Sequence, residues 1–177
     1  LETAQSHGNS VPSGRDMHEA ARAIHKAQHH TAGNGGLMRA YSVVLPYLLA
    51  SEDEFERAVV FVNTLTHVDL ETIEAAVLWS FAIRHAILTG ELTIDAGLGR
   101  LTPERRDYWR GLIAEAHSAP PAYFARNGWV IHAFQGAVSA LCHAGDVPED
   151  KFERRAYFTR VVDCLLYTSD AADDSLR

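Results

Sequence analysis

Four residues near position 35 have the types and spacing of a phosphate-binding loop. Gly33-Asn34-Gly35-Gly36 stands immediately before an apolar helical segment, and Arg39 follows in its first turn. Glycines let a ligand approach the backbone closely, and the first turn of a helix presents unpaired N–H groups with partial positive charge. The pattern therefore indicates a pocket for an anion, to which Arg39 could add donors. The alternative is an ordinary turn between two helices, with Arg39 on a solvated face.

A second candidate site lies at the junction Thr66-His67-Val68-Asp69. His67 could hydrogen-bond a ligand hydroxyl or orient a neighbouring group, while Asp69 caps the helix that follows. The alternative is a plain capped turn with an exposed histidine.

Histidines also gather early in the chain, at His18, His25, His29 and His30. No cysteine or carboxylate cluster accompanies them, so the sequence favours a solvated histidine-rich face over a metal site. The chain contains no Walker A loop, no nucleophile elbow and no zinc-protease motif. The catalytic residues therefore stay unassigned.

The composition excludes several function classes. The chain has 177 residues, is 47% apolar, and carries a formal charge of -7 from 16 basic and 23 acidic side chains. This balance argues against a nucleic-acid-binding surface. Two cysteines cannot form a disulfide framework, and nothing resembling a cleavable signal peptide opens the chain, so we expect a cytoplasmic protein. The longest uncharged stretch, residues 127–145, contains polar side chains and two internal glycines, which favours a buried helix over a membrane span.

Helical periodicity dominates the sequence and predicts an all-α chain. A broad apolar surface between the N-cap Asp69 and the stop at Gly90 predicts the central helix of a bundle. The segment between Gly90 and Thr102 is expected to be a loop. The expected helices cover residues 15–28, 37–49, 52–66, 70–89, 103–119 and 128–143, with a last one after Pro148.

For two of these helices the sequence also predicts an apolar face or an N-cap. The helix over 37–49 should have an apolar face made of Met38, Tyr41, Leu45 and Leu48. The helix over 52–66 should begin at a Ser51 N-cap, where an acidic run favours the helix dipole. That run consists of Glu52, Asp53, Glu54 and Glu56.

We expect a single domain over residues 1–164. The chain starts without methionine, and the apolar periodicity of its last helix stops near residue 165. These features indicate a fragment that carries a non-native tail over residues 165–177.

Three blocks, in this order, resemble the ADP-ribosylglycohydrolase family. Gly33-Asn-Gly-Gly-Leu-Met-Arg39, with Pro46 after it, matches the family's Gly-Asn-Gly-x-x-Met-Arg block followed by a proline. Thr66-His67 matches its Thr-His block, which precedes a long helix that ends in glycine, here Gly90. Residues 127–137 and 152–163 resemble its later helices, so the resemblance covers about residues 15–163.

The resemblance implies an all-α orthogonal helical bundle, here incomplete at both ends. It also implies two Mg²⁺ or Mn²⁺ ions and hydrolysis of the bond between ADP-ribose and a protein side chain or another acceptor. The expected partners are ADP-ribose or an ADP-ribosylated protein, without nucleic acid or membrane, and the oligomeric state is left open. The substrate-binding residues implied are Gly33, Asn34, Gly35, Met38, Arg39 and His67.

The family's metal ligands come from blocks that this chain lacks. We therefore expect no metal ligand among its residues and no activity from this chain by itself. The alternative function is a non-catalytic helical module that binds a ligand or a partner helix.

Overall fold

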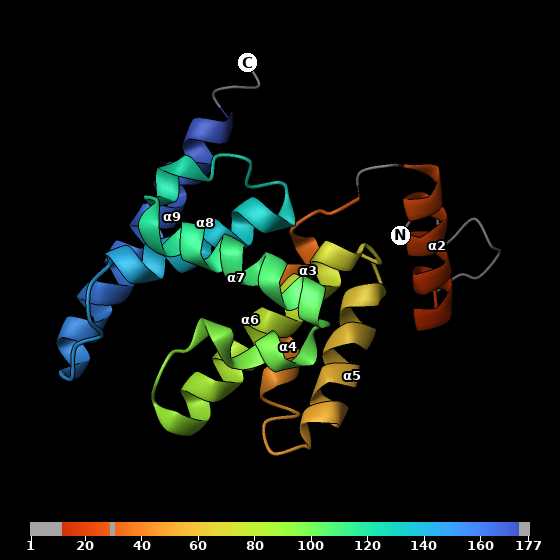
Figure 1. Cartoon of the computed structure of the whole chain (residues 1–177), viewed down its shortest axis with the longest axis horizontal. Helices are drawn as coiled ribbons and strands as arrows, with labels where there is room; N and C mark the ends of the chain where they lie inside the picture. The colour runs from red at the N-terminus through yellow and green to blue at the C-terminus, as the bar shows by residue number, and fades with distance from the viewer. Residues whose placement is uncertain (1–11, 29–30, 174–177) are drawn as a thin grey trace. The chain divides into compact units, whose positions relative to one another are not determined.

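The structure is a computed structural model that describes residues 12–28 and 31–173, with side chains described through residue 163. The described residues form helices, turns and loops without a strand, which confirms the all-α prediction (Figure 1). The chain divides into two compact units, Leu1–Leu101 (unit 1) and Thr102–Arg177 (unit 2), and each has its own helices. A single domain over residues 1–164 stays a prediction.

The described residues of unit 1 contain five α-helices and one 3-10 helix. They are α2 (Gly14–Ala27), α3 (Gly35–Arg39), α4 (Tyr41–Val44), α5 (Glu52–Thr64), α6 (Leu70–Thr89) and the 3-10 helix η1 (Ile94–Arg100). Unit 2 contains α7 (Pro103–Ser118), the 3-10 helix η2 (Pro121–Tyr123), α8 (Val130–His143) and α9 (Lys151–Asp173). None of these described helices combines the length and apolar character that a membrane span requires.

The helix ends follow the local signals of the sequence. Side-chain oxygens of Ser51, Asp69 and Thr102 each accept a hydrogen bond from a backbone N–H in the first turn of α5, α6 and α7. These bonds satisfy donors that have no partner inside the helix. Gly90 ends α6 in the left-handed conformation, with φ 82°.

Helix α6 is the centre of unit 1, as its broad apolar surface predicts. It contacts α3, α4, α5 and η1. The rings of Phe55 in α5 and Phe81 in α6 meet edge to face, with centroids 5.0 Å apart. Around this pair the core buries Ala40, Val43, Val44, Val59, Ala76 and Val77. Each face of α6 is thus covered by a different neighbour, which explains why its apolar residues do not form one stripe.

The prediction of one helix over residues 37–49 is wrong. The segment forms the short helices α3 and α4, followed by turns. At the break, the Ala40 N–H donates to the Leu37 carbonyl and the Ser42 hydroxyl donates to the Arg39 carbonyl, while Pro46 has no N–H to continue the ladder. The buried face is also different from the predicted one. Leu37, Ala40, Val43 and Val44 face the core, whereas Met38, Tyr41 and Leu45 are exposed.

The predicted loop after Gly90 is also wrong in part, because it contains η1. This 3-10 helix packs on α6 and buries Ile94 and Leu98. Gly97 permits the close approach, since a Cβ there would lie 3.0 Å from the Leu78 Cα and 3.1 Å from the Phe81 Cβ. The glycines that suggested a loop therefore serve helix packing.

Unit 2 is built around α8, which contacts α7, α9 and η2. Trp109 and Phe134 meet edge to face, with centroids 5.1 Å apart. The buried Gln135 amide donates to the Leu112 carbonyl at 3.0 Å and to a Glu115 carboxylate oxygen at 2.7 Å. Backbone of α9 continues to Asp173, through most of the expected non-native tail. The side chains of that tail and residues 174–177 lie outside the described residues.

Candidate functional site

The glycine loop, residues 33–36, leads into α3. The Gly33 N–H donates to the Thr31 carbonyl at 2.9 Å, and the Met38 N–H donates to the Asn34 carbonyl at 3.2 Å. Gly35 and Gly36 form the first turn of α3, so their N–H groups have no acceptor within the helix. Because α3 has only five residues, its dipole is small, and these N–H groups are what the loop itself offers an anion.

The second candidate residue, His67, lies in a tight turn between α5 and α6. The backbone carbonyl of Asn63 accepts from the N–H groups of both Thr66 and His67, at 3.2 and 3.0 Å. Asp69 then caps α6 by accepting from the Glu71 N–H at 3.0 Å. These bonds fix the direction in which the His67 ring leaves the backbone.

The structure brings His67 against the glycine loop. A Cβ on Gly33 would lie 3.3 Å from His67 Nε2, and a Cβ on Gly35 would lie 2.9 Å from His67 Cε1. The second distance is shorter than a normal carbon–carbon contact, so any side chain at position 35 would displace the ring. The two sequence blocks, more than thirty residues apart, form one local arrangement.

Arg39 joins this arrangement through Thr66. Its Nη2 donates to the Thr66 hydroxyl oxygen, and that oxygen lies 2.7 Å from His67 Nδ1. A guanidinium can only donate, so the Thr66 oxygen accepts from Arg39, and its second lone pair and its hydrogen are both available to Nδ1. When the hydroxyl donates to Nδ1, the ring proton lies on Nε2, the nitrogen beside Gly33.

The surroundings of His67 favour the neutral form of its imidazole. Burial lowers the pKa of His67 below 6.5, the nearby charge of Arg39 lowers it further, and the Asp69 carboxylate opposes them. A neutral ring with hydrogen on Nε2 donates one hydrogen bond without adding a charge. Such a group suits a ribose hydroxyl or a phosphate oxygen next to the loop.

Asn63 is a residue that the sequence analysis missed. Its side chain is 2% exposed and lies under the His67 turn and the glycine loop. The available signal was a polar residue four positions after Val59, on the face of α5 that carries its apolar stripe. A buried amide among apolar neighbours indicates a specific hydrogen-bonding task.

A hollow of about 490 Å³ opens beside this arrangement, between α2 and the turn after α5. Helix α2 contributes His18, Arg22, His25 and Lys26 to its lining, the end of α5 contributes Thr64, and the turn after it contributes Val68. Arg22 and Lys26 make the hollow cationic, which suits an anionic ligand. Val68 directly follows His67 in the chain, although His67 and the glycine loop are not among the residues that line the hollow.

Met38 is also predicted to bind substrate, and its side chain is 63% exposed. Only its backbone N–H therefore supports the loop.

The early histidines that the structure describes, His18 and His25, each make a separate contact with a different residue. His18 Nδ1 lies 2.9 Å from the Thr64 carbonyl oxygen, and His25 Nδ1 contacts the Thr31 hydroxyl. His29 and His30 lie outside the described residues. Among the residues that the structure describes, no three histidine, cysteine or acidic side chains converge as metal ligands do.

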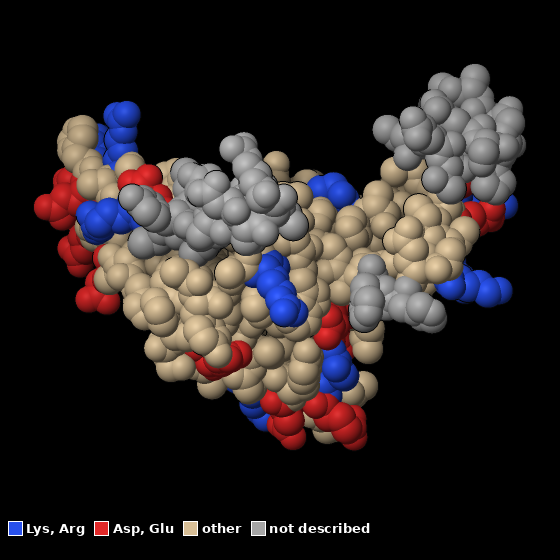
Figure 2. Space-filling view, turned by 90° about the horizontal axis from the view of Figure 1, so that it is seen from above, with Lys and Arg blue, Asp and Glu red and all other residues tan. Residues whose placement is uncertain are grey.

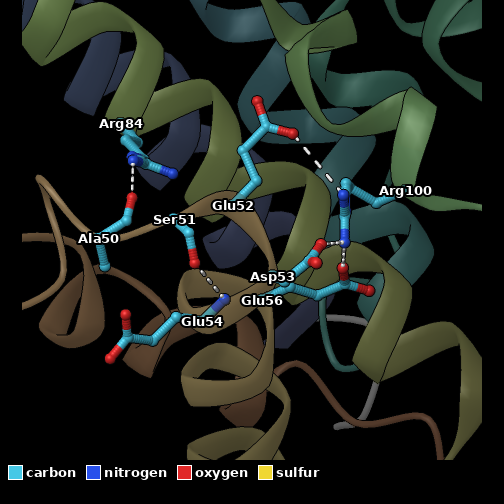
Figure 3. Close-up of polar contacts among 8 residues, drawn as sticks. All are labelled: Ala50, Ser51, Glu52, Asp53, Glu54, Glu56, Arg84 and Arg100. Carbon is cyan, nitrogen blue, oxygen red and sulfur yellow. Dashed lines mark hydrogen bonds and ion pairs between the residues drawn. The ribbon is translucent and has the colours of Figure 1, made fainter.

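The acidic run at the start of α5 surrounds an arginine (Figure 3). Arg100 Nη2 lies 2.6 Å from an Asp53 oxygen and 2.5 Å from a Glu56 oxygen, and its Nη1 lies 3.6 Å from a Glu52 oxygen. The Asp53 and Glu56 carboxylates raise the pKa of Arg100. The cluster links η1 to α5 and is already neutralised in part by its own cation. The described residues therefore do not fit the divalent ion pair that the resemblance implies.

Charged side chains are interspersed on the face shown in Figure 2. Basic residues lie there among acidic and uncharged ones. A cationic surface broad enough to track a nucleic-acid backbone is not visible on that face.

The comparison with protein families gives one result. The model of the ADP-ribosylglycohydrolase family matches residues 2–166, a range that includes the glycine loop, the His67 turn and all of α2 to α8. Neither the curated proteins nor the solved structures contain a significant match. The family match confirms the resemblance carried by the Gly33–Arg39 and Thr66–His67 blocks. The chain belongs to the ADP-ribosylglycohydrolase family.

Proposed function

We propose that this chain binds the ADP-ribose group of a modified protein side chain, or of a related acceptor, on the surface that its glycine loop and the adjoining His67 ring form together. The full activity is that of a metal-dependent hydrolase that removes this group. The contact of the His67 ring with Gly33 and Gly35 carries the proposal, because it puts backbone donors and a neutral imidazole donor at one place.

Each side chain then has a defined task. The diphosphate accepts hydrogen bonds from the loop N–H groups that follow Asn34, and Arg39 supplies a fixed positive charge. The Nε2–H of His67 donates to a ribose hydroxyl or a phosphate oxygen. Arg22 and Lys26 attract the anion into the neighbouring hollow.

The Mg²⁺ or Mn²⁺ ions that the family resemblance implies would supply Lewis-acid chemistry at the ribose. The described residues bring no three histidine, cysteine or acidic side chains together as metal ligands, and Asp53 and Glu56 of the acidic run in α5 are paired with Arg100. We therefore propose that this chain by itself binds ADP-ribose and does not hydrolyse its bond to an acceptor. Release of ADP-ribose from a modified protein by the purified chain with Mg²⁺ or Mn²⁺ would contradict this part of the proposal.

Titration with ADP-ribose tests the binding part. Isothermal titration calorimetry should show binding to the unmodified chain, and Arg39→Ala should weaken it about tenfold through the lost charge-assisted bond. Arg57→Ala is the matched control, since Arg57 is exposed on α5, outside the arrangement. Equal affinities in the two variants would remove Arg39 from the site. No heat and no thermal stabilisation with the unmodified chain would favour the non-catalytic partner-binding module.

A further inference from the structure

The side-chain amide of Asn63 connects three segments of unit 1. Its Nδ2 donates to the His67 carbonyl at 3.0 Å and to the Thr72 hydroxyl at 3.4 Å. These bonds join the end of α5 to the His67 turn and to the first turn of α6. Because the amide is buried, both donors would be costly to leave unpaired, so this connection is held firmly.

The other end of the same amide faces α3. A Cβ on Gly36 would lie 2.0 Å from Asn63 Oδ1 and 3.0 Å from its Cγ. The amide therefore lies directly against the Gly36 backbone, in space that any other residue at position 36 would occupy. The amide thus lies between α3 and the His67 turn and touches both.

Asn63 Oδ1 also has no hydrogen-bond partner among the described residues, although it is buried. An unpaired buried carbonyl costs free energy, and an apolar residue of similar size would avoid that cost. The unpaired oxygen thus offsets part of the stability that the two Nδ2 bonds contribute. What the amide adds besides stability is the donor that it directs at the His67 carbonyl.

We propose that Asn63 is a positioning residue, whose amide holds the His67 carbonyl and the Gly36 backbone at a fixed separation so that the imidazole edge and the loop N–H groups face one ligand. Asn63 itself touches no ligand, since it is enclosed by α3, α6 and the turn. The inference rests on the proposed function for the identity of that ligand, ADP-ribose, but the placement of His67 can be measured without it.

Two variants remove the amide in different ways. Asn63→Ala deletes its bonds and most of its volume, whereas Asn63→Leu keeps the branched shape with a somewhat larger volume and avoids a cavity if the alanine variant is unstable. Ser80→Ala is the matched control, because Ser80 is fully buried in the same unit and its hydroxyl lies 3.5 Å from the Ala40 carbonyl, away from His67.

The decisive measurement is the NMR titration of the His67 ring in the whole chain. Burial of the ring lowers its pKa in the unmodified protein, with Arg39 and Asp69 as the charged groups that face it. When the ring loses its fixed place and gains water, its titration midpoint should rise toward 6.5 in both Asn63 variants and stay unchanged in Ser80→Ala. The affinity for ADP-ribose should fall about tenfold in the Asn63 variants only.

The outcomes separate the two proposals. If the unmodified chain does not bind ADP-ribose, the proposed function fails, and the titration alone decides the role of Asn63. A midpoint that stays unchanged in both Asn63 variants overturns the positioning role, whatever the affinities are. A midpoint that rises equally in Ser80→Ala also overturns it, because general loosening of the core would then explain the effect.

Discussion

Gly36→Ala offers a quantitative test of the contact between α3 and Asn63. Gly36 has helical backbone, so alanine is allowed there and would by itself favour the helix by about 0.5–1 kcal/mol. The added Cβ, however, would lie 2.0 Å from Asn63 Oδ1, where ordinary contact begins near 3.4 Å. Rotation of the amide cannot relieve the overlap, because its Cγ is also only 3.0 Å away.

The expected cost follows from what must move. Overpacking of a well-packed interior costs about 1–3 kcal/mol. Displacement of the amide also weakens its bonds to His67 and Thr72, each worth about 1 kcal/mol. After the gain in helix propensity is subtracted, Gly36→Ala should lower the free energy of unfolding by about 2 kcal/mol.

Urea unfolding followed by circular dichroism measures this change in two backgrounds. In the unmodified chain the substitution should destabilise. In an Asn63→Ala background the overlap is gone, so the same substitution should be neutral or stabilising, and the double-mutant cycle should give a coupling of about 2–3 kcal/mol. The matched control is Gly111→Ala on α7, where nothing lies within 4 Å of the new Cβ and a gain of about 0.5–1 kcal/mol is expected.

A coupling energy near zero would refute the reasoning. So would Gly36→Ala with the same small gain as Gly111→Ala, because α3 would then not lie against the Asn63 amide. Equal destabilisation in both backgrounds would assign the cost to a neighbour other than Asn63.

Three further predictions concern the rest of unit 1. Arg100→Gln should lower the free energy of unfolding by about 1 kcal/mol in low salt and by less in high salt, since the carboxylates that pair with Arg100 are partly exposed. The control is Arg110→Gln, which removes an exposed ion pair and should leave the free energy of unfolding in urea unchanged. Gly97→Ala should destabilise by about 1–3 kcal/mol in a thermal melt through overlap with Leu78, and an unchanged melt would contradict the close packing of η1 on α6. Because the folded chain lowers the pKa of His67, the unfolded chain binds more protons between that value and 6.5, so stability should fall as the pH drops below 6.5. His67→Asn should reduce this loss in urea titrations on either side of pH 6.5, and identical pH profiles would contradict it.

Helix ends are the part of the fold that the sequence predicts best. Ser51, Asp69 and Thr102 cap their helices by bonds to residues two or three positions away, and Gly90 needs only its own backbone freedom to end α6. The prediction of one helix over 37–49 was wrong because tertiary contacts decide which residues of this segment are buried. Its apolar spacing is helical, yet the contacts of α3 and α4 with α5 and α6 bury Leu37, Ala40, Val43 and Val44 instead of the predicted face.

The sequence also predicts one part of the candidate site, whereas the rest depends on tertiary packing. The types and order of Gly33, Asn34, Gly35, Arg39 and His67 were sufficient to predict a family and an anion-binding loop, because small residues before a helix and a capped histidine turn are local patterns. The family match bears out that family, while the roles of the individual residues stay predictions.

Only the packing of α3, α5 and α6 decides that the His67 ring lies on the loop and that Thr66 links it to Arg39. The same packing makes the Asn63 amide a spacer between them. The spacing of residues along the sequence predicts neither the contact between His67 and the loop nor the position of Asn63. Both depend on atoms that are far apart in the chain and come within a few ångströms only when the apolar faces of the helices are buried together.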